Sequence, residues 1–230
     1  MTAVQPAATI NWKQSNVAEA LAHLYLRLNG FLTTSLILQS EEYGKNRTDV
    51  DYIAVRFPRH LQDLPMAETS SFLAVVPDVV NVIICEVKSE EPVEFNKPIR
   101  EQESVRQDLL QWLGAFDQQQ IKSIAKDLEP LLAPDVDIKA VLRGATCDGF
   151  IVRPLLCYPA GRTDSKRWCL VESEIFTFID ARFNPSNVVP CSPRYNFQQW
   201  GYSLAPVVDY FKKEEKPHSL NGLYDYLGVK

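Results

Sequence analysis

The apolar positions of the chain are densest between Val79 and Val87, in a run rich in β-branched residues that contains a glutamate and is followed by a lysine. The run is apolar on both faces of an extended chain, which is typical of a central strand covered by helices on both sides. Because side chains alternate between the two faces of a strand, Glu86 and Lys88 share one face. Charges carried to such a position are costly to desolvate unless they are paired, hydrated or bound to a metal. The end of this strand is therefore a candidate site.

The rest of the hydrophobic pattern predicts strands alternating with helices. An amino-terminal helix is expected up to Leu28, with Asn16 as its N-cap and Glu19 as the capping partner. Further strands are expected at residues 31–39, 49–55, 138–142, 149–158 and 175–183. Further helices are expected at residues 99–116 and 118–132, and a short one at 66–76 within an insertion. This alternation predicts an α/β fold with a mixed central sheet and helices on both faces.

Chain length predicts one elaborated domain, because 230 residues fall within the range of a single large α/β domain. We expect this domain over residues 1–230, with a core at about 15–160 and a carboxyl-terminal elaboration at 161–230. The elaboration is rich in prolines, turns and aromatic residues. Aromatic residues near Arg194 could stack on nucleobases, although such clusters more often close a core.

Composition and charge narrow the classes of function. The hydrophobic fraction of 46% and the charged fraction of 23% are ordinary for a globular protein. A net charge of -5 argues against a protein that coats nucleic acid non-specifically, but a nuclease's own acidic ligands contribute to such a count. Five cysteines without a Cys-x-x-Cys pair indicate reduced thiols in a cytoplasmic protein. We expect no signal peptide and no association with a membrane, because no apolar run is long enough to span a bilayer.

A second strand that carries acidic residues precedes the Glu86 strand. Asp51 begins the apolar part of residues 49–55 and would lie beside Glu86 if the two strands pair as neighbours. Two carboxylates and a lysine suit Mg²⁺ or Mn²⁺ better than zinc or copper. The alternative is that Glu86 and Lys88 form a surface ion pair where the strand emerges into water, with the two acidic strands apart in the fold.

Cations close to these strands and in the middle of the chain could contact phosphates. Lys45 and Arg47 precede the acidic strand, although a charged turn is usually only a solvated turn. A larger group could form a phosphate-facing patch and comprises Arg143, Arg153, Arg162, Lys166 and Arg167. Whether its members share one face does not follow from the sequence.

Three short motifs resemble the PD-(D/E)xK nuclease superfamily, nearest to its Holliday-junction-resolvase-like, restriction-endonuclease-like branch. That branch has a first-helix glutamate followed by alanine, leucine and glycine, and Glu19, Ala22, Leu26 and Gly30 have this spacing. It has an acidic-hydrophobic-Asp-hydrophobic strand, which residues 49–52 match, and then a hydrophobic-Glu-Val-Lys strand. The resemblance covers roughly the first 115 residues.

The resemblance implies a restriction-endonuclease-like fold and a metal-dependent endonuclease that hydrolyses DNA phosphodiester bonds. Asp51, Glu86 and the carbonyl of Val87 would hold Mg²⁺ or Mn²⁺, which polarises the scissile phosphate and lowers the pKa of a bound water. Lys88 would orient that water or stabilise charge in the transition state. Such nucleases often carry a polar residue on the next helix, for which Gln107 is the candidate. A homodimer is expected if both strands of a duplex are cut.

Several alternatives stay open at the level of the sequence. The segment between Asp51 and Glu86 is longer than in compact resolvases, and the literal Pro-Asp at 77–78 makes Asp78 a rival for the aspartate role. We prefer Asp51 because it leads a strand of its own. Glu19 could equally be a capping residue on a solvated face, and Arg106 is a second candidate beside Gln107. The alternative function is a catalytically inactive nuclease-like scaffold that binds nucleic acid or protein.

Overall fold

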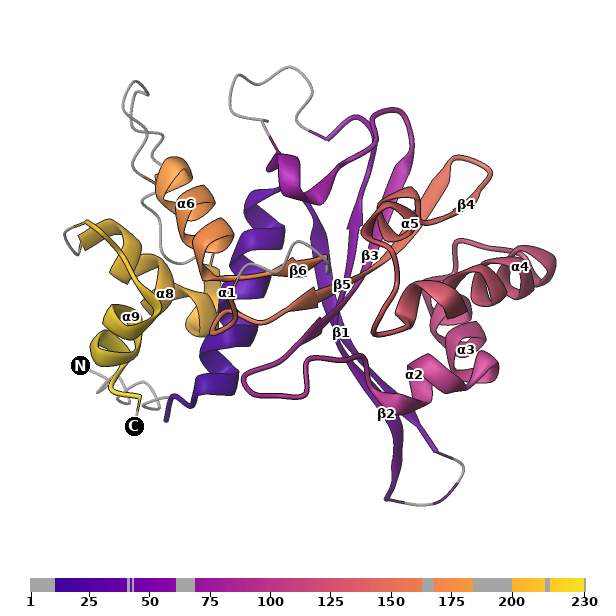
Figure 1. Ribbon diagram of the computed structural model, residues 1–230, viewed down its shortest axis with the longest axis horizontal. Coiled ribbons are helices and arrows are strands. Elements are labelled where there is room, and N and C mark those ends of the chain that lie inside the picture. Colours follow the sequence, from indigo (N-terminus) through magenta and orange to yellow (C-terminus); the bar gives the residue numbers. More distant parts are fainter. Residues whose placement is uncertain are drawn as a thin grey trace, which may run out of the picture.

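A six-stranded mixed sheet lies between two groups of helices (Figure 1). The computed structural model describes residues 11–40, 42, 44–60, 69–162, 168–183, 200–213 and 216–229. The strands are β1 (Leu32–Gln39), β2 (Asn46–Arg56), β3 (Val80–Val87), β4 (Ala145–Cys147), β5 (Phe150–Cys157) and β6 (Cys169–Leu170). Their order is β1-β2-β3-β5-β4, with β6 also paired to β5. The pairs β3–β5 and β5–β6 are parallel, and the others are antiparallel.

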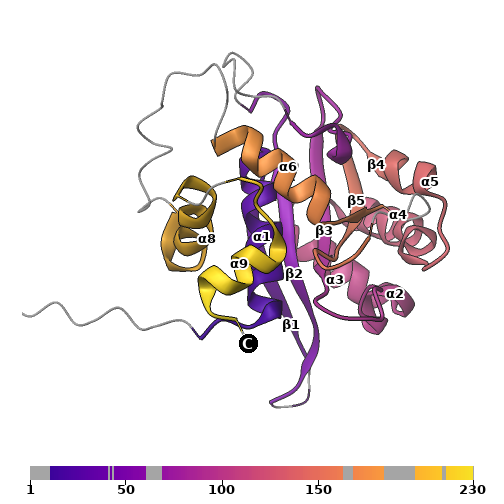
Figure 2. The same ribbon diagram turned by 60° about the vertical axis from the view of Figure 1, so that its left-hand side comes forward.

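Helices cover both faces of this sheet, as Figure 2 shows from a second direction. One group comprises α1 (Gln14–Leu28), α6 (Glu172–Phe183), α8 (Gly201–Lys213) and α9 (Leu220–Leu227). The opposite group comprises α2 (Lys97–Glu101), α3 (Glu103–Leu113), α4 (Gln118–Leu128) and η2 (Glu129–Leu132). The short helix α5 (Ile138–Arg143) packs along β5, and η1 (Ser71–Leu73) precedes β3. The α/β class and the mixed sheet with helices are therefore confirmed.

The strand β3 is the centre of the sheet and contributes to both hydrophobic cores. Ile83 and Cys85 belong to the core beneath α1, whereas Val82 and Ile84 belong to the core beneath α3 and α4. All four side chains are at most 2% exposed. The apolar run therefore forms a strand buried on both faces, as its sequence predicts.

Two of the predicted strands are helices. Residues 138–142 form α5, because the Asp137 side chain accepts the N–H of Lys139 at the helix start and Gly144 ends the helix. Residues 175–183 belong to α6, in which Ile175, Ile179 and Phe183 are buried at helical spacing. Both segments are rich in β-branched or aromatic residues, whose strand preference depends on their packing. The carboxyl-terminal region also contains two helices, α8 and α9, where the sequence predicts mainly turns.

Other boundaries differ from the prediction in smaller ways. The expected helix at 99–116 is two helices, α2 and α3, with extended backbone at Gln102. The expected helix at 118–132 is α4 followed by η2. Residues 66–68 of the expected short helix lie outside the described residues, as do Lys166, Arg167, Cys191 and Arg194. None of the helices in the described ranges is long and apolar enough to cross a membrane.

Candidate active site

The pairing of β2 with β3 brings the predicted carboxylates together. Tyr52 lies opposite Cys85 in this antiparallel pair, and the same register places the preceding Asp51 opposite Glu86. Asp51 Oδ2 also accepts the backbone N–H of Val87 at 2.6 Å. The acidic strands are therefore neighbours, contrary to the alternative in which they lie apart.

A β-bulge in β2 lies at the position of the aspartate. Against β1, Thr34 pairs with Ile53 and Leu36 pairs with Val50. Two residues of β2, Asp51 and Tyr52, therefore face a single residue of β1. A bulge bends the strand and changes the direction of a side chain, and bulges are frequent beside active sites. The residue that bonds to the main chain of β3, Asp51, thus lies within this bulge.

Glu86 is a buried carboxylate with one oxygen unpaired. Its side chain is 4% exposed, and Oε1 accepts a hydrogen bond from Lys88 Nζ at 2.6 Å. The second oxygen, Oε2, is buried and has no hydrogen-bond partner within the described part of the chain. Burial raises the pKa of Glu86 to about 7, against the lowering effect of Lys88. A buried and unpaired carboxylate oxygen is costly, so it marks a place where a cation would be favourable.

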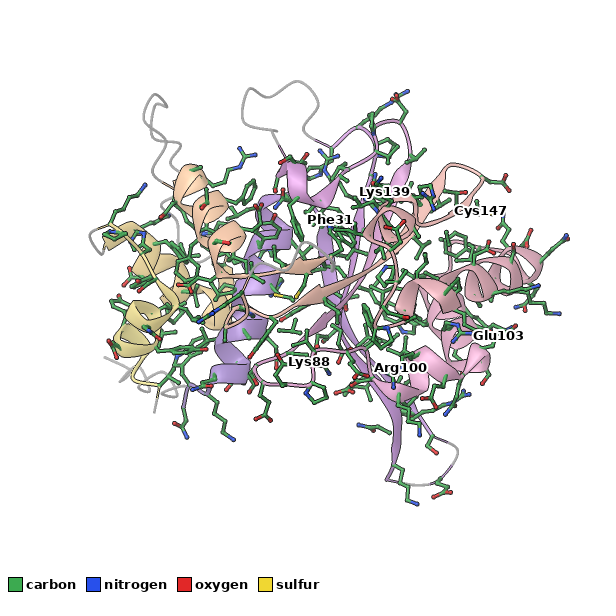
Figure 3. The ribbon with its side chains drawn as sticks, in the orientation of Figure 1. Phe31, Lys88, Arg100, Glu103, Lys139 and Cys147 are labelled. Atoms are coloured by element: carbon green, nitrogen blue, oxygen red, sulfur yellow. The ribbon has the colours of Figure 1, made fainter. Side chains whose placement is uncertain are left out.

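The Lys88 ammonium is held by two side chains at the point where β3 leaves the sheet (Figure 3). Besides Glu86, it donates to Asn96 Oδ1 at 3.1 Å. The Asn96 amide in turn donates to Asp49 Oδ1 at 3.2 Å. Asn96 therefore links the lysine to β2, which sequence reasoning missed. Its place just before α2 marks it as a candidate helix cap but gives no sign of these two partners.

Glu19 lies close to the strand carboxylates, although the sequence places it away from the apolar stripe of its helix. Burial raises its pKa, and the charges of Asp51 and Asp49 raise it further. The helix begins at Gln14, and Asn16 accepts the N–H of the N-cap residue, Lys13. The capping interpretation of Glu19 is therefore wrong, because the first turn lies earlier than predicted.

The Asp51 carboxyl is also affected by its surroundings. Burial raises its pKa, the N–H of Val87 lowers it, Asp49 raises it and Lys88 lowers it. Next to it, the ring of Tyr52 stacks on His23 of α1 with the ring centroids 5.0 Å apart. Burial lowers the pKa of His23 to about 4, so this imidazole is neutral at pH 7. Asp49, Asp51 and Glu86 thus lie near the Lys88 ammonium, whereas the rings of Tyr52 and His23 pack on the α1 side of the sheet.

The other proposed site residues lie elsewhere or have other partners. Gln107 donates to Glu103 on its own helix at 2.7 Å, and Figure 3 shows Glu103 well away from Lys88. Arg106 is 1% exposed and donates to three main-chain carbonyls and to Glu129, so it holds helices together instead of facing the site. Asp78 is exposed and precedes the amino end of β3, at the far end of the strand from Glu86.

Several predicted phosphate-binding cations are also used differently. Arg153 is fully buried and donates to the carbonyls of Leu73 and Ala74, so its expected place in a phosphate-facing patch is wrong. Arg47 forms an ion pair with Asp108 of α3, and Lys45 pairs with Glu42 in its own turn. Arg143 and Arg162 are exposed and remain accessible to a ligand.

The donor set at the end of β3 fits a hard divalent cation held largely through water. Among the described residues, no group of three or more His, Cys, Asp or Glu side chains is arranged to hold a metal. Mg²⁺ needs only one or two carboxylates, because it retains several water ligands. The free oxygen of Glu86 and the carboxylate of Asp51 meet this need. The N–H of Val87 points to Asp51, and in a strand the carbonyl of the same residue points to the same side.

Comparisons of the chain with models of protein families, with curated proteins and with solved structures find no match. The resemblance to the nuclease superfamily therefore stays a prediction.

Proposed function

We propose that this protein is a metal-dependent nuclease that hydrolyses DNA phosphodiester bonds at the end of β3. The observation that carries the proposal is Oε2 of Glu86, which is buried and has no hydrogen-bond partner among the described residues, while Oε1 of the same carboxylate binds the Lys88 ammonium. Native structures rarely leave a buried carboxylate oxygen unpaired, so this oxygen favours a ligand site over an ion pair with a purely structural role.

In this proposal, Asp51, Glu86 and the Val87 carbonyl hold Mg²⁺ or Mn²⁺. When bound, such an ion lowers the pKa of a coordinated water and offsets the charge of the phosphate. The ionised form of Glu86 is needed for this role, and its pKa of about 7 means that neutral or alkaline pH favours binding.

In this proposal, Lys88 supplies a positive charge for the phosphate. Its side chain is 22% exposed, so the ammonium can reach a ligand while Glu86 and Asn96 fix its position. A cation held in place before the reaction stabilises the negative charge that develops on the phosphate, without the cost of reorganising during the step. Glu19 and Asp49 add negative charge around the site and so favour a divalent cation there.

The test is Mn²⁺-dependent cleavage of branched, single-stranded and duplex DNAs by the intact protein and by Asp51→Asn, Glu86→Gln and Lys88→Ala. Each substitution should lower the cleavage rate by at least about 100-fold, as loss of a preorganised group in an active site does. The matched control is Asp78→Asn, since Asp78 is exposed at the other end of β3. Metal-dependent cleavage retained in all three variants would overturn the proposal. Native mass spectrometry and analytical ultracentrifugation would show whether the active form is the expected homodimer.

A nuclease-like scaffold that binds nucleic acid or protein without cutting is the second candidate. The observation that favours it is that the described residues offer no group of three metal-binding side chains. Calorimetry with Mn²⁺ discriminates between the two, because a scaffold has no need to hold the ion between Asp51 and Glu86. Binding of Mn²⁺ that Glu86→Gln abolishes supports the nuclease, whereas DNA binding without any Mn²⁺ binding supports the scaffold.

A further inference from the structure

A pocket of about 400 Å³ lies at the carboxyl ends of the parallel strands β3, β5 and β6. Its walls come from the segments that follow these three strands, with Glu91, Tyr158, Arg162 and Val171 among them, and from Cys169 of β6 itself. Ligands of α/β proteins commonly bind in crevices outside the carboxyl ends of parallel strands. None of the residues named in the proposed reaction lines this pocket.

The pocket is next to the proposed active site. Glu86 of β3 pairs with Leu156 of β5, and Leu156 pairs with Cys169 of β6, which lines the pocket. Neighbouring strands are about 5 Å apart, so the pocket wall at Cys169 lies about 10 Å from the Glu86 position. The N–H of Lys88 also donates to the Cys157 carbonyl at 2.8 Å, just before Tyr158. A ligand in the pocket would therefore be a close neighbour of a phosphate held at Lys88.

The walls of the pocket combine an aromatic ring with apolar side chains and one charge of each sign. The half-buried ring of Tyr158 forms one wall, and the chain at Gly161 packs so closely that a Cβ there would lie 2.6 Å from the ring. Val93 and Val171 add apolar surface. The exposed cation is Arg162, and the carboxylate is Glu91.

The carboxylate of Glu91 has a defined position, because its Oε2 accepts the N–H of Val93 at 3.3 Å. A carboxylate at the rim repels phosphate but accepts hydrogen bonds from an amino group on a base. An aromatic ring binds the face of any base. With the base in the pocket, Arg162 can contact the next phosphate of the same DNA strand. This set of groups fits one nucleotide whose base is free to enter.

We propose that this pocket binds the base of a nucleotide adjacent to the scissile phosphate, with a preference for bases that carry an exocyclic amino group. The inference rests on the proposed function and adds to it the class of substrate. A base can enter such a pocket only when it is unpaired or turned out of the duplex. The substrate is therefore single-stranded or distorted DNA, and not regular duplex.

The first test measures binding of a single-stranded trinucleotide with 2-aminopurine at its centre, in the presence of Mg²⁺. All proteins carry Lys88→Ala, which the proposed function makes inactive, so the probe stays intact. Stacking on Tyr158 should quench the fluorescence of the probe. Tyr158→Leu should abolish the quench and weaken binding about tenfold, and Tyr158→Phe should retain both. The matched control is Tyr226→Leu, because Tyr226 is an exposed tyrosine on α9.

The second test changes the two charged residues of the pocket, Arg162 and Glu91. Arg162→Ala should weaken binding several-fold, whereas Arg143→Ala, which removes the same charge from an exposed site on α5, should not. Glu91→Gln should reduce the preference for adenine or cytosine over thymine at the central position. An equal effect of the two arginine substitutions would show that only overall charge matters and would overturn the assignment.

The two proposals can fail separately. If the starting protein does not bind the trinucleotide, or if Tyr158→Leu binds and quenches it unchanged, the base pocket is wrong. Metal-dependent cleavage lost in Glu86→Gln would still support the nuclease in that case. Conversely, binding that depends on Tyr158, without cleavage of any DNA by the intact protein, would support the pocket and reject the nuclease.

Discussion

Glu86 is the residue whose chemistry most distinguishes this site from an ordinary surface ion pair. Its pKa of about 7, compared with the ordinary carboxyl value of 4.5, results mainly from burial. The folded protein therefore keeps a proton on Glu86 in a pH range where the unfolded chain has released it. A carboxyl held in this state makes the site responsive to both pH and metal.

This pKa predicts how the stability of the metal-free protein depends on pH. Because the folded pKa is raised, the contribution of Glu86 to stability is fully present below pH 4.5 and is lost as the pH rises to about 7. The size of the loss is on the order of 3 kcal/mol. Glu86→Gln should lack this part of the dependence. Urea unfolding in EDTA at pH 5 and pH 8 would measure it, and an identical change with pH in both proteins would contradict the prediction.

Asn96 is a positioning residue in the proposed reaction. It contacts Lys88 and Asp49, and it would act on the phosphate only through the position of the Lys88 ammonium. Asn96→Ala should lower kcat about tenfold, because the ammonium loses one of its two fixed partners. The KM for DNA should change little, since the charge of Lys88 is kept. Asn46→Ala, at an exposed position that begins β2, is the control. A change in KM alone would show that Asn96 has a different role.

At the scale of elements, the helices beneath the site are joined by one buried arginine. Arg106 of α3 donates to the carbonyl of Ala125 in α4 and to those of Ile99 and Arg100 in α2. Its remaining partner is Glu129, at the start of η2. The short helix α2 begins directly after Asn96, so the position of that residue depends on the same contacts.

Arg106→Met should therefore lower the free energy of unfolding by about 3 kcal/mol or more, because three main-chain carbonyls in the interior lose a charged donor and Glu129 loses its ion-pair partner. Arg143→Ala, at an exposed position, should change it by less than about 0.5 kcal/mol. Chemical denaturation of both variants would check this difference. Stability of Arg106→Met equal to that of the intact protein would mean that water or other groups replace the guanidinium.

The sequence allowed prediction of those elements whose evidence is local. The run at β3 has apolar residues on both faces and a carboxylate at its end, so its central place could be predicted. Its pairing with the Asp51 strand stayed one of two alternatives, because no local pattern shows which strands are neighbours. The helix α6 could not, because Ile175 and Phe176 favour a strand unless the burial at Ile179 and Phe183 is known. The Asn96 bridge and the proximity of Glu19 depend on contacts between separate elements, which no local pattern records.

At the scale of the whole molecule, the carboxyl-terminal helices are part of the core. Leu204, Val207 and Phe211 of α8 are fully buried in the cluster that contains Ile83 and Cys85 of β3. The helix α1 contacts both α6 and α8, so these helices fix the element that carries Glu19. The expected carboxyl-terminal elaboration thus packs against α1, the helix that carries Glu19. Its aromatic residues Tyr210 and Phe211 are buried and close a core, as the sequence also allowed.

The distribution of charge gives the last prediction. The protein has a net charge of -5, and several carboxylates surround Lys88, so a phosphate is repelled until a cation is bound. In the Lys88→Ala background, Mg²⁺ should raise the affinity for single-stranded DNA at least about tenfold. Adding Asp51→Asn and Glu86→Gln should raise the affinity without Mg²⁺ and remove the effect of the ion. Fluorescence anisotropy in EDTA and in Mg²⁺ would measure both changes.

The control for this prediction is Asp78→Asn with Glu103→Gln, which changes the net charge by the same two units at exposed positions away from the site. These substitutions should leave both the affinity and its Mg²⁺ dependence close to those of the Lys88→Ala protein, because charges separated by more than a Debye length are largely screened at physiological salt. If the control pair raises the affinity as much as the site pair, then DNA responds to the overall charge. If only the site pair does so, the carboxylates at the end of β3 are the barrier that the metal removes.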